Sequence, residues 1–351
     1  MTDALPEWPL FGFADDARPA LRAVLEAGKP AALATIIGLG DGGPRPVGTQ
    51  MVIADGVVSG FLSGGCLESD VAGHARQCLA DGAPQRLVYG EGSPWPDIRL
   101  LCGARIEILL ERVTPDDPAA VQLLALERAR VPALWRTDGV RRACAAADRP
   151  PADWPGAFSK LYEPTLRLIV LGSDPTALAI ATLGGQAGCE TTLVRPKGPE
   201  SPPALPGFAY SRDEPAQALA AIGLDPWTAV AVATHDAELD HAALAAALPS
   251  KAFYVGALGA RRRVADRKAW LKADGISDGD IARLHAPIGL DIGGKAPWEV
   301  AIAVLGEITA LRYARASGST STGSPGAAAG APAGRRSSAS ALANTVTSDE
   351  S

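Results

Sequence analysis

The chain has 351 residues, of which 47% are hydrophobic and 21% charged, so it can form a sizeable globular core. Its net charge of -6 argues against a nucleic-acid surface, and neither a signal peptide nor an apolar run of the roughly 20 residues that a membrane helix needs is visible. Its 5 cysteines are scattered and odd in number, which excludes a disulfide framework and a structural zinc site, so we expect a reduced cytoplasmic protein without nucleic-acid or membrane partners.

The first elements predicted are a helix over residues 15–29 and a buried strand over 31–37. The loop that follows, 38–48, is rich in Gly and Pro, so its backbone can approach a ligand closely. Arg45 stands in this loop between two prolines. Two interpretations stay open at this point: Arg45 clamps an anion, or it is a surface arginine with stiff neighbours.

A hairpin over residues 51–61, turning at Asp55-Gly56, leads into a turn that contains Gly64, Gly65 and Cys66. A helix is predicted to follow over 67–79, with Glu68 in its first turn favouring the helix dipole. A thiol at a helix N-terminus has its thiolate stabilised, so Cys66 is a candidate functional residue; the alternative is a small buried core cysteine.

The rest of the first half is predicted to alternate strands and one helix. Cys102 precedes one of these strands at a loop junction, where a packed core thiol is as good an interpretation as a functional one. The composition becomes loop-like around Pro150-Pro151, and we place a domain boundary near residue 163. The predicted elements are strands over 85–89, 105–111, 133–135 and 141–144 and a helix over 117–129.

The second half opens as a nucleotide-binding β-α-β unit does, with an apolar strand over 166–171, a turn at Gly172 and an apolar helix. The glycine fingerprint is damaged because Asp174 occupies a glycine position, where its charge would repel a pyrophosphate. Asp174 is nevertheless a good N-cap. Arg195 stands where a ribose-binding carboxylate is expected, so a Rossmann-like fold is predicted but NAD(P) binding is not.

Candidate site residues follow the later strands of this half. A strand over 229–233 ends at Thr234 and His235, at the edge where open α/β sheets bind ligands. His235 is an acid, base or metal-ligand candidate, or a histidine that only satisfies a loop. Gly289, Asp291 and Gly293 form a tight loop that could touch a phosphate or pterin, or that only starts the last helix, predicted over 297–313.

Together these elements predict an α/β protein. It has an N-terminal α/β domain with the hairpin and the Gly-Gly-Cys turn over 12–162, and a Rossmann-like parallel sheet over 163–314. Residues 315–351 are Ser, Thr, Gly, Ala and Pro with few large apolar residues, so we expect a disordered tail.

The chain resembles the XdhC/CoxI family, the maturation factors of xanthine dehydrogenase and related molybdenum hydroxylases. Any one of the matching motifs would be weak, but together they are specific. They are Gly43-Pro44-Arg45 with Gly48, Ser63-Gly64-Gly65-Cys66-Leu67-Glu68, Cys102-Gly103, Thr234-His235-Asp236, the run from Gly256 to Arg262, and the run from Pro287 to Gly293.

The resemblance implies a cytoplasmic chaperone that binds molybdenum cofactor as cargo, keeps it for sulfuration by a cysteine desulfurase, and delivers it to an apo molybdenum hydroxylase. By the same resemblance Cys66 and Cys102 contact the molybdenum or its sulfur ligand, and Arg45 meets the phosphate or pterin. The remaining cofactor-binding candidates are Gly64, Gly65, Glu68, Thr234, His235, Gly289, Asp291 and Gly293. Thiolate is a suitable soft ligand for such a centre.

The family pattern is broken in two places: Gly172-Ser173-Asp174-Pro175 replaces the usual glycine turn, and Ala104 replaces a second glycine after Cys102-Gly103. We therefore expect a maturation factor and not a turnover enzyme. An NAD(P)-dependent oxidoreductase built on the second half and a scaffold that links a desulfurase to its target are kept as alternatives. A homodimer is also left open.

Overall fold

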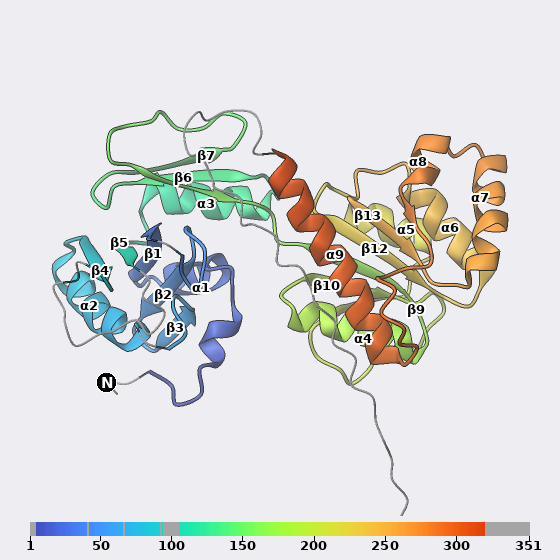
Figure 1. Cartoon of the computed structure of the whole chain (residues 1–351), viewed down its shortest axis with the longest axis horizontal. Coiled ribbons are helices and arrows are strands. Elements are labelled where there is room, and N and C mark those ends of the chain that lie inside the picture. The colour runs from blue at the N-terminus through green and yellow to red at the C-terminus, as the bar shows by residue number, and fades with distance from the viewer. Residues whose placement is uncertain (1–4, 41, 66, 92, 94–104, 320–351) are drawn as a thin grey trace, which may run out of the picture. The chain divides into compact units, whose positions relative to one another are not determined.

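The computed structural model describes residues 5–319, except 41, 66, 92 and 94–104. Cys66, Cys102 and most of the predicted tail lie outside the described residues. The chain divides into a unit of residues 1–308 and a second unit of 309–351, of which the end of one helix is described. The first unit contains three sheets (Figure 1).

The first sheet is antiparallel and five-stranded, in the order β3-β2-β1-β5-β4. Along its central strand, Ala31 and Leu33 join one apolar cluster with α1 and α3, whereas Ala32 and Ala34 join another with α2. This alternation follows from the period of two along a strand and explains why both faces are covered. The elements are η1 Leu10–Phe13, α1 Arg18–Glu26, β1 Ala31–Leu39, β2 Gln50–Ala54, β3 Val57–Gly60, α2 Glu68–Asp81, β4 Gln85–Tyr89 and β5 Ile106–Val113.

The predicted hairpin is present, since Ala54 pairs with Val57 across Asp55-Gly56 and Gly56 has a φ of 74°. A separate three-stranded antiparallel sheet follows in the order β7-β6-β8, after α3. Its strand β8 occupies a stretch for which we predicted no helix or strand. The bounds are α3 Pro118–Arg128, β6 Ala133–Thr137, β7 Arg142–Ala146 and β8 Phe158–Tyr162.

The third sheet is parallel and six-stranded, in the order β11-β10-β9-β12-β13-β14. This is the order of the doubly wound dinucleotide-binding fold, with the direction of winding reversing between β9 and β12. Every residue of β9, β12 and β13 is buried, as expected for strands covered on both faces. Thus the Rossmann-like sheet predicted for the second half is confirmed.

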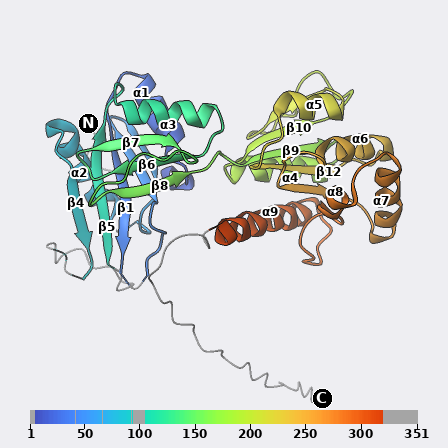
Figure 2. The ribbon, with the colours of Figure 1, turned by 90° about the horizontal axis from the view of Figure 1, so that it is seen from above.

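Helices cover both faces of this sheet (Figure 2). Side chains of α5, α6 and α7 share one apolar cluster with β9 and β12. The final helix continues to Ser319, six residues beyond the predicted end, and no helix in the described part of the chain is long and apolar enough to cross a membrane. The elements are β9 Arg167–Gly172, α4 Pro175–Gln186, β10 Glu190–Val194, β11 Ala209–Ser211, α5 Pro215–Ile222, β12 Thr228–Ala233, α6 Ala237–Ala247, β13 Tyr254–Ala257, η2 Arg261–Arg263, α7 Val264–Ala273, α8 Asp278–Ala282, β14 Leu284–His285 and α9 Pro297–Ser319.

Candidate functional site

The turn between β3 and α2 is organised by one buried carboxylate, that of Glu68. Its Oε1 accepts hydrogen bonds from the backbone N–H groups of Leu62 and Ser63 at 2.9 and 2.7 Å. Its Oε2 accepts from the Ser63 hydroxyl and from the N–H groups of Gly65 and Leu67, at 2.9, 3.0 and 3.2 Å. The side chain that we predicted to favour the helix dipole, and listed among the cofactor-binding candidates, therefore holds the turn through its own hydrogen bonds.

Glu68 stays ionised although it is buried. Burial by itself would raise the pKa of this carboxyl, but the hydrogen bonds from Ser63 and Leu62 outweigh it and hold the pKa below its ordinary value of 4.5. A charge with so many fixed donors makes the turn stiff. It also means that both oxygens of Glu68 are engaged within the turn and do not project outward.

Gly64 and Gly65 are exposed at the tip of this turn, as a ligand-facing backbone requires. Both have positive φ, 133° and 97°, and a Cβ built on either would meet nothing within 4 Å. The glycines are thus needed for backbone conformation and not for close packing. They leave an unobstructed backbone immediately before position 66.

Arg45, the predicted anion clamp, forms an ion pair with Asp15. The two side chains are 32% and 76% exposed, so the pair faces solvent. Exposed pairs are weak, typically below about 1 kcal/mol, and an incoming anion can replace such a partner. In this structure the Arg45 side chain pairs with a carboxylate, and in the sequence Arg45 lies between two prolines. This arrangement agrees both with an arginine that can bind an anion and with a surface arginine that has stiff neighbours.

The remaining candidates belong to the parallel sheet. Asp174 caps α4 by accepting from the Ala177 N–H at 2.8 Å, as predicted. Its other oxygen lies 3.0 Å from Nε2 of His235, whose side chain is 71% exposed. His235 and Asp174 thus meet where the winding of the sheet reverses, between β9 and β12, and a carboxylate fills the place where a pyrophosphate would bind.

Thr234, by contrast, is buried beneath this edge and acts within a network. Its hydroxyl is 2.6 Å from Oδ1 of Asp240, and Oδ2 of Asp240 accepts from Arg267 at 2.7 Å. Burial raises the pKa of Asp240 despite these partners. Neither Asp240 nor Arg267 was singled out from the sequence, because the helices α6 and α7 that carry them meet only in the tertiary structure.

The loop after β14 contains the last three candidates. Gly289, with a φ of 86°, donates its N–H to Oε2 of Glu307 at 2.8 Å. Asp291 pairs with Arg261 at 2.7 Å, with both side chains more than three-quarters exposed. Gly293, with a φ of 83°, lines an open hollow in front of α9. The candidates therefore form two groups, one on the antiparallel sheet and one on the parallel sheet.

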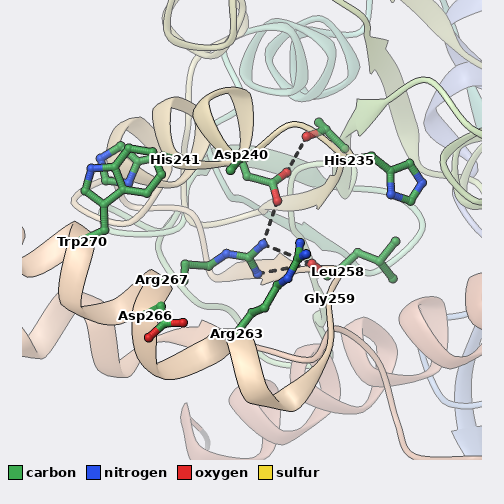
Figure 3. A pocket seen from close by; sticks show the side chains of 11 residues that line it. His235, Asp240, His241, Leu258, Gly259, Arg263, Asp266, Arg267 and Trp270 are labelled. Atoms are coloured by element: carbon green, nitrogen blue, oxygen red, sulfur yellow. Dashed lines mark hydrogen bonds and ion pairs between the residues drawn. The ribbon is translucent and has the colours of Figure 1, made fainter.

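A cavity of about 470 Å³ opens beside Thr234 and His235 (Figure 3). Besides these two, it is lined by side chains that the sequence did not indicate, from α6 and from η2 and α7: Asp240, His241, Arg263, Asp266, Arg267 and Trp270. In the sequence they belong to no motif that points to a site, and only the basic run at 261–263 adjoins them. Among the described residues, no group of three or more His, Cys, Asp or Glu side chains could hold a metal ion.

Comparison with known proteins agrees with the family resemblance. The family description "XdhC Rossmann domain" matches residues 168–308, and "XdhC and CoxI family" matches 24–90. The chain is 32% identical, over 85% of its length and 89% of the relative's, to the molybdenum cofactor insertion chaperone PaoD of Escherichia coli (strain K12). The chain belongs to the XdhC and CoxI family.

Two further proteins are similar to this chain at lower sequence identity. A protein of Bacillus subtilis (strain 168), named as a probable subunit of xanthine dehydrogenase, is 25% identical over 83% of this chain and 96% of its own. A crystal structure described as a xanthine dehydrogenase from Bacillus halodurans superposes with a TM-score of 0.69 at 23% identity, covering 88% of this chain and 98% of that one. That likeness confirms the fold of this family member.

Proposed function

We propose that this chain is a maturation factor that binds molybdenum cofactor as cargo, holds it for sulfuration and inserts it into a xanthine dehydrogenase-like molybdenum hydroxylase. The observation that carries the proposal is the similarity to PaoD across most of both chains. The stiff, exposed glycine turn before position 66 supports it, because cargo must be held without being transformed. We place the activity in the cytoplasm and divide the chain into domains over 12–162 and 163–314.

The residues of the turn suggest how the cargo is held. Glu68 fixes the backbone, and the bare glycines let a bulky planar ligand approach. A thiol at position 66, two residues before the N-terminus of α2, is favoured as thiolate by the helix dipole, and thiolate is a soft ligand for molybdenum or its sulfur. Cys102 is proposed as the second thiol. Arg45 would exchange Asp15 for the phosphate of the cargo.

The test is cofactor retention by the full chain, purified from a host that makes molybdenum cofactor. Molybdenum and pterin per chain are measured for the wild type, Cys66→Ala and Cys102→Ala. Cys144→Ala is the matched control, because burial raises the pKa of the Cys144 thiol to about 12 and keeps it protonated. We expect retention to fall sharply in Cys66→Ala and to persist in Cys144→Ala. Stoichiometric retention in both Cys66→Ala and Cys102→Ala would refute the role of the thiols.

Partners follow from the proposed function. We propose an apo molybdenum hydroxylase as the recipient and a cysteine desulfurase as the sulfur donor, with a homodimer as one assembly to test. Pull-down of purified partners by cofactor-loaded and cofactor-free protein distinguishes this proposal from a pure scaffold. A scaffold binds both partners equally in the two states, whereas a delivery factor binds its client better when loaded.

An NAD(P)-dependent oxidoreductase is the second candidate, favoured by the strand order of the parallel sheet. Asp174 argues against it, since its carboxylate caps α4 and pairs with His235. Calorimetric titration with NAD(H) and NADP(H) decides between the two. Micromolar binding by the wild-type chain would favour the enzyme; no binding, with a gain in Asp174→Asn, would show that the charge excludes the dinucleotide while the cap is kept.

A further inference from the structure

The cavity of the parallel sheet borders the position where a dinucleotide fold holds its pyrophosphate, because His235 both lines the cavity and pairs with Asp174, but Asp174 itself is not part of the lining. That position, the turn after β9, is occupied by Asp174. The cavity instead opens beyond β12 and β13, between the loops at their carboxyl ends and the helices α6 and α7 (Figure 3). Because a cavity of about 470 Å³ is within the range of small-molecule sites, its lining indicates what it would accept.

Three side chains of different chemistry line the cavity at the start of α7, one from Arg263, which ends η2 and is the N-cap of α7, and two from α7 itself. Arg263, Asp266 and Trp270 follow one another at spacings of three and four residues, and all line the cavity. At a rise of 1.5 Å per residue they extend over about 10 Å along the helix. The order along the cavity is therefore a cation, a carboxylate and an aromatic ring.

The cation of these three is available to a ligand. Arg267 is engaged, because it donates to Asp240 at 2.7 Å and to the carbonyl oxygen of Leu258 at 3.2 Å. Arg263 is exposed, and among the residues that the structure describes nothing pairs with its guanidinium. A guanidinium binds phosphate oxygens in a bidentate geometry, so Arg263 can anchor a phosphate while Arg267 keeps the wall rigid.

The ring at the other end is held by stacking on a second ring of the lining. Trp270 stacks on His241 with ring centroids 3.9 Å apart and an interplanar angle of 12°. His241 is held in turn by Asp274, whose Oδ2 lies 2.6 Å from Nε2. Trp270 remains 41% exposed and lines the cavity. A braced indole with accessible surface is a platform on which a planar base can stack.

We propose that this cavity binds a ribonucleoside monophosphate laid along α7. Arg263 holds the phosphate, Asp266 accepts hydrogen bonds from the ribose hydroxyls, and the base stacks on Trp270. A carboxylate beside a cationic anchor disfavours a second phosphate but suits a sugar with hydroxyl donors, so the site selects a mononucleotide over a dinucleotide. This site does not involve the turn at Gly64 and Gly65, and the proposal does not rest on the proposed function.

Calorimetry on the full chain tests the assignment with AMP, 2′-deoxy-AMP, adenosine, inorganic phosphate and NAD as probes. We expect AMP to bind most tightly, and Arg263→Ala to weaken AMP to the level of adenosine. Trp270→Ala should weaken AMP at least about tenfold, with partial recovery in Trp270→Phe. Arg262→Ala and Trp298→Ala are matched controls, since both residues are exposed and neither lines the cavity.

Each outcome of the calorimetry either supports or overturns the mononucleotide site. Loss of affinity in Arg263→Ala and Trp270→Ala with unchanged binding in the two controls supports the site, and weaker binding of 2′-deoxy-AMP supports the role of Asp266. Absence of AMP binding, AMP affinity insensitive to both variants, or NAD binding tighter than AMP would overturn the proposal. Cofactor retention by Arg263→Ala and Trp270→Ala is measured in parallel, so failure here is separable from failure of the cargo hypothesis.

Discussion

Replacing Glu68 by Gln should loosen the turn before α2, although the shape and volume of the side chain remain almost unchanged. Oε1 accepts two hydrogen bonds and Oε2 three, all from groups within the turn. A glutamine amide keeps only one acceptor oxygen, and its NH₂ group must face N–H donors. At least two hydrogen bonds are lost, and at about 1 to 1.5 kcal/mol each the cost is about 2 to 3 kcal/mol.

Two measurements check this loss. Urea unfolding at pH 7 reports the change in stability, and amide hydrogen exchange of the segment 61–69 reports whether the N–H groups of the turn have lost protection. Glu238→Gln is the matched control: Glu238 is also an acidic residue in the first turn of a helix, but it is exposed. Removing the charge of Glu238 should lower the free energy of unfolding by less than about 1 kcal/mol.

The pH dependence of the free energy of unfolding is an independent test of the role of Glu68. Because the folded-state pKa of Glu68 lies below its ordinary value of 4.5, its contribution is present above that pH and is lost as the pH falls through the folded value. The wild type should therefore lose stability on acidification more steeply than Glu68→Gln. If Glu68→Gln matches Glu238→Gln in both stability and exchange, the carboxylate does not organise the turn and our reasoning is refuted.

Two further predictions concern charges inside the fold. Burial lowers the pKa of Lys160 from 10.5 to about 8, so the unfolded chain binds more protons between these values and stability rises with pH there. Lys160→Met should abolish this rise in urea midpoints, and an equal rise in the variant would contradict the assignment. Arg267→Ala leaves the buried Asp240 without its ion pair and should cost about 3 kcal/mol in urea unfolding. Arg261→Ala, which breaks an exposed pair, should cost below about 0.5 kcal/mol; equal costs would show that Arg267 is not needed.

Local chemistry made much of the fold predictable. Asp55-Gly56 specifies a two-residue hairpin turn, and the observed pairing of Ala54 with Val57 follows from it. Asp174 and Pro175 specify a helix start, and the structure has the cap and the helix there. Strand β8 was missed because its sequence, Phe-Ser-Lys-Leu-Tyr, does not alternate apolar and polar residues and its partner β6 lies more than 20 residues away. A short non-local pairing of this kind has no strong local signal.

For the candidate sites, too, the sequence predicted some features and the structure decided others. The sequence alone predicted that Gly64 and Gly65 form a turn before a helix, and glycine is the residue that tolerates the positive φ that the structure has at both positions. It also identified the family, because motifs are linear. Only the structure showed that Glu68 turns its carboxylate inward onto five donors; all of them lie within six residues of Glu68 in the sequence, but their shared direction depends on the path of the chain between β3 and α2.

The cavity of the parallel sheet was beyond sequence reasoning for the same physical reason. Its walls come from the end of β12 and from α6 and α7, elements whose approach is set by packing on the shared core and not by any local signal. Asp240 and Arg267 are 27 positions apart, yet their side chains are 2.7 Å apart in the folded chain. Local conformations are determined by short-range sterics and hydrogen bonding, which the sequence displays, whereas such a wall exists only once the helices are packed.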